Sequence, residues 1–157
     1  MKIILFSGII AVLVLLLFSC NDKIDVQKAY DFSLSSWYLQ NKIKRGESVE
    51  IRLTLSRSGN YDGAAYFIGY VQRQGKGEVF DTDDIYLVNR EQIELAALAD
   101  LRVDKDGNYT FTLFYRSLSD KKSEIQFVVT DNFQQEQTLL VAFEPDTEKE
   151  GNDESAD

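Results

Sequence analysis

The chain has 157 residues, a length that favours one domain with terminal appendages. Hydrophobic residues make up 44% and charged residues 27%, close to ordinary globular usage, so a generally disordered chain is excluded. The net charge of −9 has the wrong sign for binding a phosphate backbone, so we expect no direct nucleic-acid partner. Because the chain has no His and one Cys, we expect no internal disulfide and no His-based catalysis or zinc site.

The N-terminus is apolar and ends at the only cysteine. Lys2 precedes an apolar run over residues 3–18, which is too short for a membrane span and fits a cleaved secretory signal. Leu17-Phe18-Ser19-Cys20 resembles the lipobox of bacterial lipoproteins, in which the cysteine is acylated and becomes the new N-terminus. The sequence therefore predicts a signal peptide over 1–19, lipidation at Cys20 and a tether over 20–28. The alternative is an uncleaved anchor; both place the remaining chain outside the cytoplasm.

Residues 29–143 are dominated by a period of two. It is clearest over Ser48–Ser56, where Val49, Ile51, Leu53 and Leu55 alternate with polar residues, the pattern of a half-buried antiparallel strand. Turn clusters of Gly, Asn, Asp and Ser separate this segment from further apolar runs. The other predicted strands cover residues 29–34, 64–72, 85–88, 109–116, 125–129 and 139–143.

One segment departs from this pattern. Ile93, Ala97 and Leu101 have helical spacing, and no Gly or Pro interrupts residues 90–101, so a short surface helix is predicted there. About seven strands in this length predict an all-β fold, an immunoglobulin-like antiparallel β-sandwich over residues 29–143. A small Greek-key barrel is the alternative.

Residues 144–157 are strongly acidic. They contain seven Asp or Glu residues against one Lys, with Ala156 and Pro145 the only other residues that are not polar or glycine. Such a segment cannot bury enough apolar surface to offset its ordering entropy, so we predict a disordered tail.

Two acidic loops are candidates for site chemistry. The run from Asp104 through Asp106 to Asn108 has the alternate acids of a calcium loop, but its Gly falls at the wrong position, so a hairpin turn is favoured. Asp81, Asp83 and Asp84 could supply a carboxylate pair for acid and base catalysis, and a solvated loop is the favoured alternative. We expect no catalytic residue, no metal and no cofactor.

Aromatic residues are abundant, at 12% of the chain. The predicted strand 64–72 is apolar on both faces, yet a sandwich buries only one face of a strand. Tyr66 and Tyr70 would form a partner-binding surface if they point outward, and Trp37 shares this ambiguity. The alternative is that the segment Glu78–Asp106 covers the two tyrosines.

A block of residues resembles a known family. The run from Arg57 to Ile68, continuing to Gln74-Gly75-Lys76-Gly77, is similar to the TraQ-type lipoproteins of conjugative transposons. Shorter matching pieces are Cys20-Asn21-Asp22, Ala29-Tyr30-Asp31-Phe32, Lys44-Arg45-Gly46-Glu47 and Asp131-Asn132-Phe133. The resemblance implies an immunoglobulin-like fold, an N-terminal lipid and a role beside the DNA-transfer apparatus of an integrative element, with no catalytic residue and no cofactor.

The chain departs from the family pattern in three places. The segment Glu78–Asp106 is longer and more helical than expected, Gln135 stands where Gly is expected, and the acidic tail is an addition.

The leading hypothesis is a lipid-anchored, non-enzymatic envelope protein that docks onto other proteins of a conjugation machine, through an exposed strand face or the long connection. The alternative is a surface glycan- or ligand-binding module that uses Trp37, Tyr66 or Tyr70 as stacking platforms. A hydrolase that uses two of the acidic residues ranks last.

Overall fold

The computed structural model describes residues 29–38, 40–60 and 63–147. The predicted signal peptide, Cys20 and the tether lie outside these residues, as does the predicted tail from residue 148 onward. Among the described residues, no helix has the length and apolar character that a membrane span requires.

Eleven strands and one short 3-10 helix, η1, form the described chain. Their bounds are β1 Phe32–Trp37, β2 Lys42–Ile43, β3 Ser48–Arg57, β4 Tyr66–Gln74, β5 Gly77–Phe80, β6 Tyr86–Leu87, β7 Gln92–Glu94, η1 Leu95–Ala97, β8 Arg102–Val103, β9 Tyr109–Ser117, β10 Ser123–Asp131 and β11 Glu136–Pro145.

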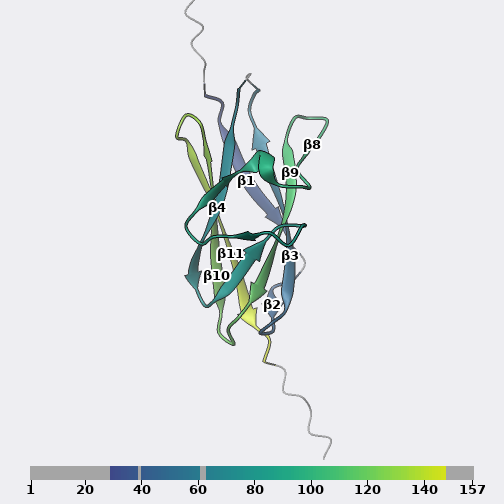
Figure 1. Ribbon diagram of the computed structural model, residues 1–157, viewed down its shortest axis with the longest axis vertical. Coiled ribbons are helices and arrows are strands. Elements are labelled where there is room, and N and C mark those ends of the chain that lie inside the picture. Colours follow the sequence, from purple (N-terminus) through teal and green to yellow (C-terminus); the bar gives the residue numbers. More distant parts are fainter. Residues whose placement is uncertain (1–28, 39, 61–62, 148–157) are drawn as a thin grey trace, which may run out of the picture.

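The strands form two sheets that pack face to face (Figure 1). The first sheet has the strand order β1-β3-β9-β5-β6, with β8 also paired to β9. The second sheet has the order β2-β11-β10-β4-β7. Neighbouring strands are antiparallel, except that β2 runs parallel to β11. The predicted immunoglobulin-like β-sandwich is confirmed, and the barrel alternative is wrong because the sheets remain separate.

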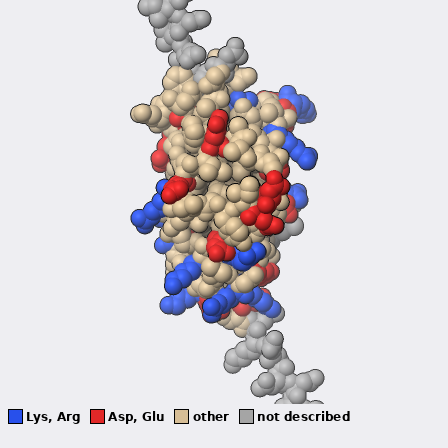
Figure 2. Space-filling model, viewed as in Figure 1, with Lys and Arg blue, Asp and Glu red and all other residues tan. Residues whose placement is uncertain are grey.

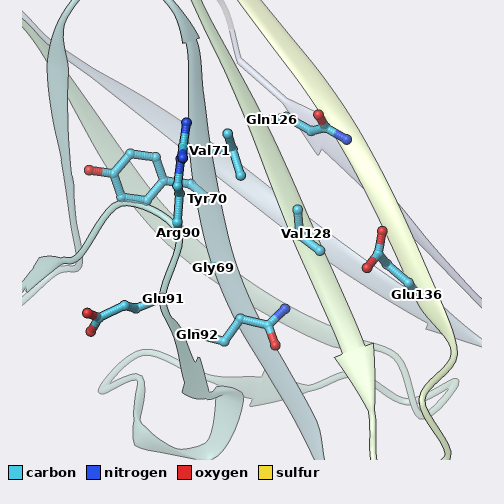
Figure 3. Close-up of a pocket in the computed structure, with 9 residues that line it drawn as sticks. All are labelled: Gly69, Tyr70, Val71, Arg90, Glu91, Gln92, Gln126, Val128 and Glu136. Carbon is cyan, nitrogen blue, oxygen red and sulfur yellow. The ribbon is translucent and has the colours of Figure 1, made fainter.

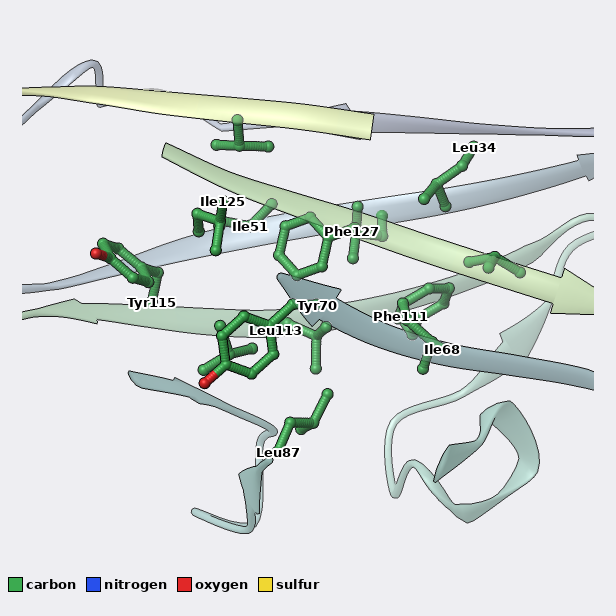
Figure 4. Close-up of a cluster of buried hydrophobic side chains, with 14 of the residues drawn as sticks. Leu34, Ile51, Ile68, Tyr70, Leu87, Phe111, Leu113, Tyr115, Ile125 and Phe127 are labelled. Atoms are coloured by element: carbon green, nitrogen blue, oxygen red, sulfur yellow. The ribbon is translucent and has the colours of Figure 1, made fainter. Parts of the chain in front are cut away.

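Alternation along the strands builds the core. β9 and β10 alternate between buried and half-buried residues over most of their length, and β3 alternates between buried and exposed residues. The inward side chains of the two sheets meet in one cluster, where Ile51, Leu113 and Phe127 have no exposed surface (Figure 4). Each fully buried side chain of this kind contributes about 1.5–3 kcal/mol to folding.

The predicted helix over residues 90–101 is wrong. Only Leu95–Ala97 form a 3-10 turn, and β7 precedes it and pairs with β4. The apolar residues with helical spacing do not form one helical face, because the chain here crosses from the first sheet to the second (Figure 1). Leu95 and Leu98 reach into the core from this crossing, while Ala96 and Ala97 are exposed.

Three hairpin loops share one design. In each, an Asp carboxylate oxygen, Oδ1, accepts the backbone N–H groups two and four positions later at 2.8–2.9 Å. These residues are Asp81, Asp104 and Asp131. The residue three positions after each Asp has a positive φ: Asp84 at 60°, Gly107 at 81° and Gln134 at 66°. The interpretation of residues 104–108 as a hairpin turn is confirmed.

The loop from β10 to β11 shows how the chain does without the glycine that the family pattern leads one to expect at position 135. The position that requires a left-handed backbone is Gln134, whereas Gln135 donates from Nε2 to the Tyr30 carbonyl oxygen and to Asp131 Oδ2. Gln135 therefore ties the loop to the start of the described chain, which a glycine could not do.

The last strand continues two residues beyond Phe143, into the segment that the sequence predicts as the acidic tail. The Glu144 N–H donates to the Asn41 carbonyl oxygen at 2.9 Å, and the Asp146 N–H donates to the Ile43 carbonyl oxygen at 3.1 Å. These bonds form the parallel pairing of β2 with β11.

Ending the chain at Phe143 tests this pairing. Because two backbone hydrogen bonds of about 1 kcal/mol each are lost, the melting temperature should fall by about 5–10 °C relative to a chain that ends at Thr147. Circular dichroism during heating measures the difference. Equal melting temperatures would show that the pairing contributes nothing to stability.

Replacement of Gln134 by Gly tests the strain in the third hairpin. The substitution should raise the free energy of unfolding by about 0.5–1 kcal/mol, because glycine adopts positive φ without steric cost. Gln137→Gly is the matched control, because it makes the same change at another exposed residue, in this case within strand β11. It should lower stability, because glycine is unfavourable inside a strand. Urea denaturation measures both, and a destabilised Gln134→Gly protein would contradict the assignment.

Candidate interaction surface

Trp37 lies at the end of β1 on the outer face of the first sheet and is 55% exposed. In the strand register it stands opposite Arg52 of β3, whose guanidinium carbon lies 5.2 Å from the indole centre. The Arg52 Nε donates to Glu50 Oε1 at 2.7 Å. Trp37, Glu50 and Arg52 border two hollows, of about 450 and 230 Å³. The sequence leaves the direction of Trp37 open, and in the structure the side chain is exposed. Its role in binding remains a prediction.

Tyr66 and Tyr70 do not face outward. They are only 4% and 5% exposed, and both belong to the core between the sheets. Tyr66 packs edge-on against Phe32 and Tyr109, at centroid distances of 5.3 and 5.8 Å. The prediction of a partner-binding tyrosine pair is therefore wrong.

The inward direction of these tyrosines has a local cause. Gly69 lies between them on the other face of β4, and a Cβ there would lie 2.2 Å from the Glu91 carbonyl oxygen. The backbone before β7 thus covers the outer face of β4 at Gly69, while the larger tyrosine rings fill the space between the sheets.

Burial raises the pKa of both Tyr66 and Tyr70 above the ordinary tyrosine value. For Tyr70, a hydrogen bond with the Val79 backbone partly opposes this effect. The folded protein therefore favours the neutral form of these phenols.

Asp81 and Asp104 each organise a separate turn and are not brought together. Asp81 is 3% exposed, and its Oδ1 is occupied by the backbone of its own hairpin. Asp104 is used in the same way, and hydrogen bonds from Asn108 lower its pKa. β5 and β8, which carry these loops, pair with different parts of β9. Within the described residues, no group of three acidic, His or Cys side chains could hold a metal ion.

A second exposed feature lies at the other edge of the first sheet. Ile85, Tyr86 and Val88 are 60%, 48% and 56% exposed, and we call these three residues the β6 patch. β6 is an edge strand that pairs only with β5 among the described strands. Adjacent exposed apolar side chains of this kind typically mark an interaction site.

The β6 patch rests on an aromatic support. Phe80 contacts Tyr86 and stacks on Phe114, each with a centroid distance of 5.4 Å. The Arg116 guanidinium carbon lies 5.1 Å from the Phe80 ring centre, and its Nη1 donates to the Tyr86 hydroxyl at 3.0 Å. Tyr86 is therefore held in place before any partner binds, which lowers the entropic cost of association.

The sequence pattern did not single out the β6 patch. The sequence predicts a strand over residues 85–88, in which alternation would bury every second residue, but only Leu87 is buried. Ile85 belongs to the turn that Asp81 organises. The sequence feature that could have indicated the patch is a run of four large apolar residues directly after an acidic turn.

The outer face of the second sheet carries a hollow of about 600 Å³ (Figure 3). Gly69, Val71 and Val128 form its floor, and Arg90 and Glu136 stand at its margins. Figure 2 shows acidic side chains scattered across this face of the molecule, with basic side chains mainly at its sides and lower end.

Comparison with known proteins identifies the family. The model of the TraQ conjugal transfer protein family matches residues 3–146. The chain belongs to this family. The match includes the block from Arg57 to Gly77, so the resemblance noted in the sequence is confirmed. A search of curated proteins gives no match.

Solved structures agree with the family assignment. A conjugative transposon lipoprotein from Bacteroides eggerthii is 27% identical, with a TM-score of 0.59, over 73% of this chain and 98% of that one. A lipoprotein from Bacteroides thetaiotaomicron is 30% identical, with a TM-score of 0.58, over 87% and 97%. A conjugate transposon protein from Bacteroides vulgatus is 30% identical, with a TM-score of 0.59, over 83% and 98%.

The block that carried the resemblance has structural roles. A Cβ at Gly77 would lie 2.2 Å from the Tyr115 ring, so only glycine fits against this buried side chain. Arg57 joins the end of β3 to the hairpin before β9, because its Nε donates to the Gly107 carbonyl oxygen at 2.9 Å and its guanidinium lies over the Tyr109 ring. These family features therefore stabilise the sandwich.

Replacing Tyr70 by Phe tests the burial of this phenol through its pH dependence. Because the folded pKa is raised, stability is fully present below the ordinary pKa of about 10 and is lost as pH rises through the folded value. The Tyr70→Phe protein should lose stability less steeply above about pH 10. Urea midpoints across the alkaline range measure this, with the range below about pH 9 as internal control. An identical alkaline decline in both proteins would contradict the assignment.

Proposed function

We propose that this member of the TraQ family is a lipid-anchored, non-enzymatic component of a conjugative transposon transfer apparatus, and that it docks onto another envelope protein of that apparatus. The β6 patch carries the proposal, because it combines exposed apolar residues with a preorganised aromatic side chain on an edge strand.

The composition of the surrounding surface supports a protein partner. Trp, Tyr and Arg are the residue types most enriched at the energetic centres of protein interfaces. The β6 patch and the arginine that holds it in place present two of these types, Tyr86 and Arg116.

The attachment to a membrane rests on Cys20. Its lipobox-like context and the lipoprotein relatives support acylation at this residue. Two or more acyl chains give stable anchoring, so the domain would act at the cell envelope, on the periplasmic or outer-membrane face.

The Cys20→Ala variant tests the anchor. It should release the protein from membranes, as measured by membrane fractionation and by mass spectrometry of the acylated peptide. Continued membrane attachment, or acylation at another residue, would refute the assignment.

The transfer frequency of the mobile element that carries the gene tests the docking role. After a clean deletion, transfer should collapse and should be restored by the wild-type gene. The double variant Ile85→Lys and Val88→Lys should fail to restore transfer, because two charges enter the β6 patch. Both residues are more than half exposed, so the melting temperature should not change.

Leu140→Lys supplies the matched control. Leu140 is 58% exposed but lies on the outer face of the second sheet, so this variant should restore transfer. Full restoration by the double variant would remove the β6 patch as the docking site, and unchanged transfer after deletion would remove the function itself.

A further inference from the structure

The two hollows beside Trp37 have a chemistry that differs from that of the β6 patch. We infer that this groove, bordered by Trp37, Glu50, Arg52, Asp100, Arg102 and Thr112, binds a neutral saccharide chain. The inference is independent of the proposed protein docking, because it rests on different residues.

The exposed indole supplies an apolar surface. The Arg52 guanidinium lies over the indole ring, 5.2 Å from its centre, and 55% of the Trp37 surface remains exposed. A flat aromatic surface of this size matches the C–H face of a sugar ring, which is apolar although its edges carry hydroxyl groups.

The charges around the groove cancel. Glu50 and Asp100 oppose Arg52 and Arg102, and Glu50 already pairs with Arg52 at 2.7 Å. This balance offers hydrogen-bond donors and acceptors without a net charge that would select an ionic ligand. An uncharged ligand with many hydroxyl groups is therefore the best match.

Asp100 lies at the wall of the larger hollow. Its Oδ2 accepts the Thr112 N–H at 2.9 Å, which fixes the carboxylate at the wall of the larger hollow. Its Oδ1 is buried without a hydrogen-bond partner among the described residues. This oxygen has almost no accessible surface, so Asp100 contributes negative charge to the wall and no direct ligand contact through Oδ1.

The arrangement favours a chain over a single sugar. Trp37, Glu50 and Arg52 border both hollows, so the hollows adjoin each other at these residues. Their volumes are about 450 and 230 Å³. A saccharide that occupies both hollows would stack one ring on Trp37 and place its neighbours in the hollows.

An array of neutral oligosaccharides of graded length, built from glucose, mannose, galactose or xylose, tests the inference. The protein applied to the array is the full-length acylated form, kept in solution by a detergent that contains no sugar. At least one series should be retained, with affinity that rises with length until both hollows are filled. Because Trp37 is the only tryptophan, its fluorescence should shift on titration with the retained oligosaccharide.

Two variants decide the location of binding. Trp37→Ala should weaken the affinity measured by calorimetry by at least about tenfold, whereas Leu140→Ala, at a residue of similar exposure on the other sheet, should leave it unchanged. The inference would be overturned if no neutral oligosaccharide were retained, or if the Trp37→Ala protein retained it equally well. It would also be overturned if only a protein or a charged polymer shifted the Trp37 fluorescence. None of these results depends on conjugal transfer.

Discussion

The burial of alternate side chains between two sheets is the constraint on which this structure depends. The chain has one cysteine, so no internal disulfide can staple the fold, and the described residues offer no metal cluster. Stability must come from side chains such as Ile51, Leu113 and Phe127, which are completely buried between the sheets. The rest of the molecule is arranged around this requirement.

The same constraint determines what the surface presents. Adjacent residues of a strand point to opposite faces, so fixing the inward row also fixes the outward row. Because Leu53 and Phe111 point inward, Arg52 and Thr112 must point outward and lie beside each other in the register. A slip of one residue would exchange the two rows and destroy both the core and the Trp37 groove.

Much of the candidate binding surface comes from the segment that breaks the simple alternation. The chain between β4 and β9 supplies strands to both sheets, so its short elements are held by local bonds more than by long ladders. Asp81 organises the turn that leaves Ile85 exposed, and Arg116 from β9 positions Tyr86. The aromatic and arginine side chains of the first sheet thus give one outer face two distinct chemistries, apolar at β6 and polar with balanced charges at Trp37.

The sequence by itself determined the fold class and the inward rows of the long strands, because a period of two depends only on the order of residues. The alternation of β3, β9 and β10 was readable for this reason, and the Asp-Gly turn before β9 could be recognised from its local chemistry.

Only the tertiary structure decided which face of β4 is buried, since both faces are apolar and the choice depends on how the Glu91 backbone packs over Gly69. It also decided that residues 90–101 form a crossing segment and not a helix, because pairing with β4 and insertion of Leu95 and Leu98 into the core override the local helical spacing. The neighbours of Trp37 come from β3, β9 and the Asp100 loop, and residues so far apart in the chain are brought together only by strand pairing.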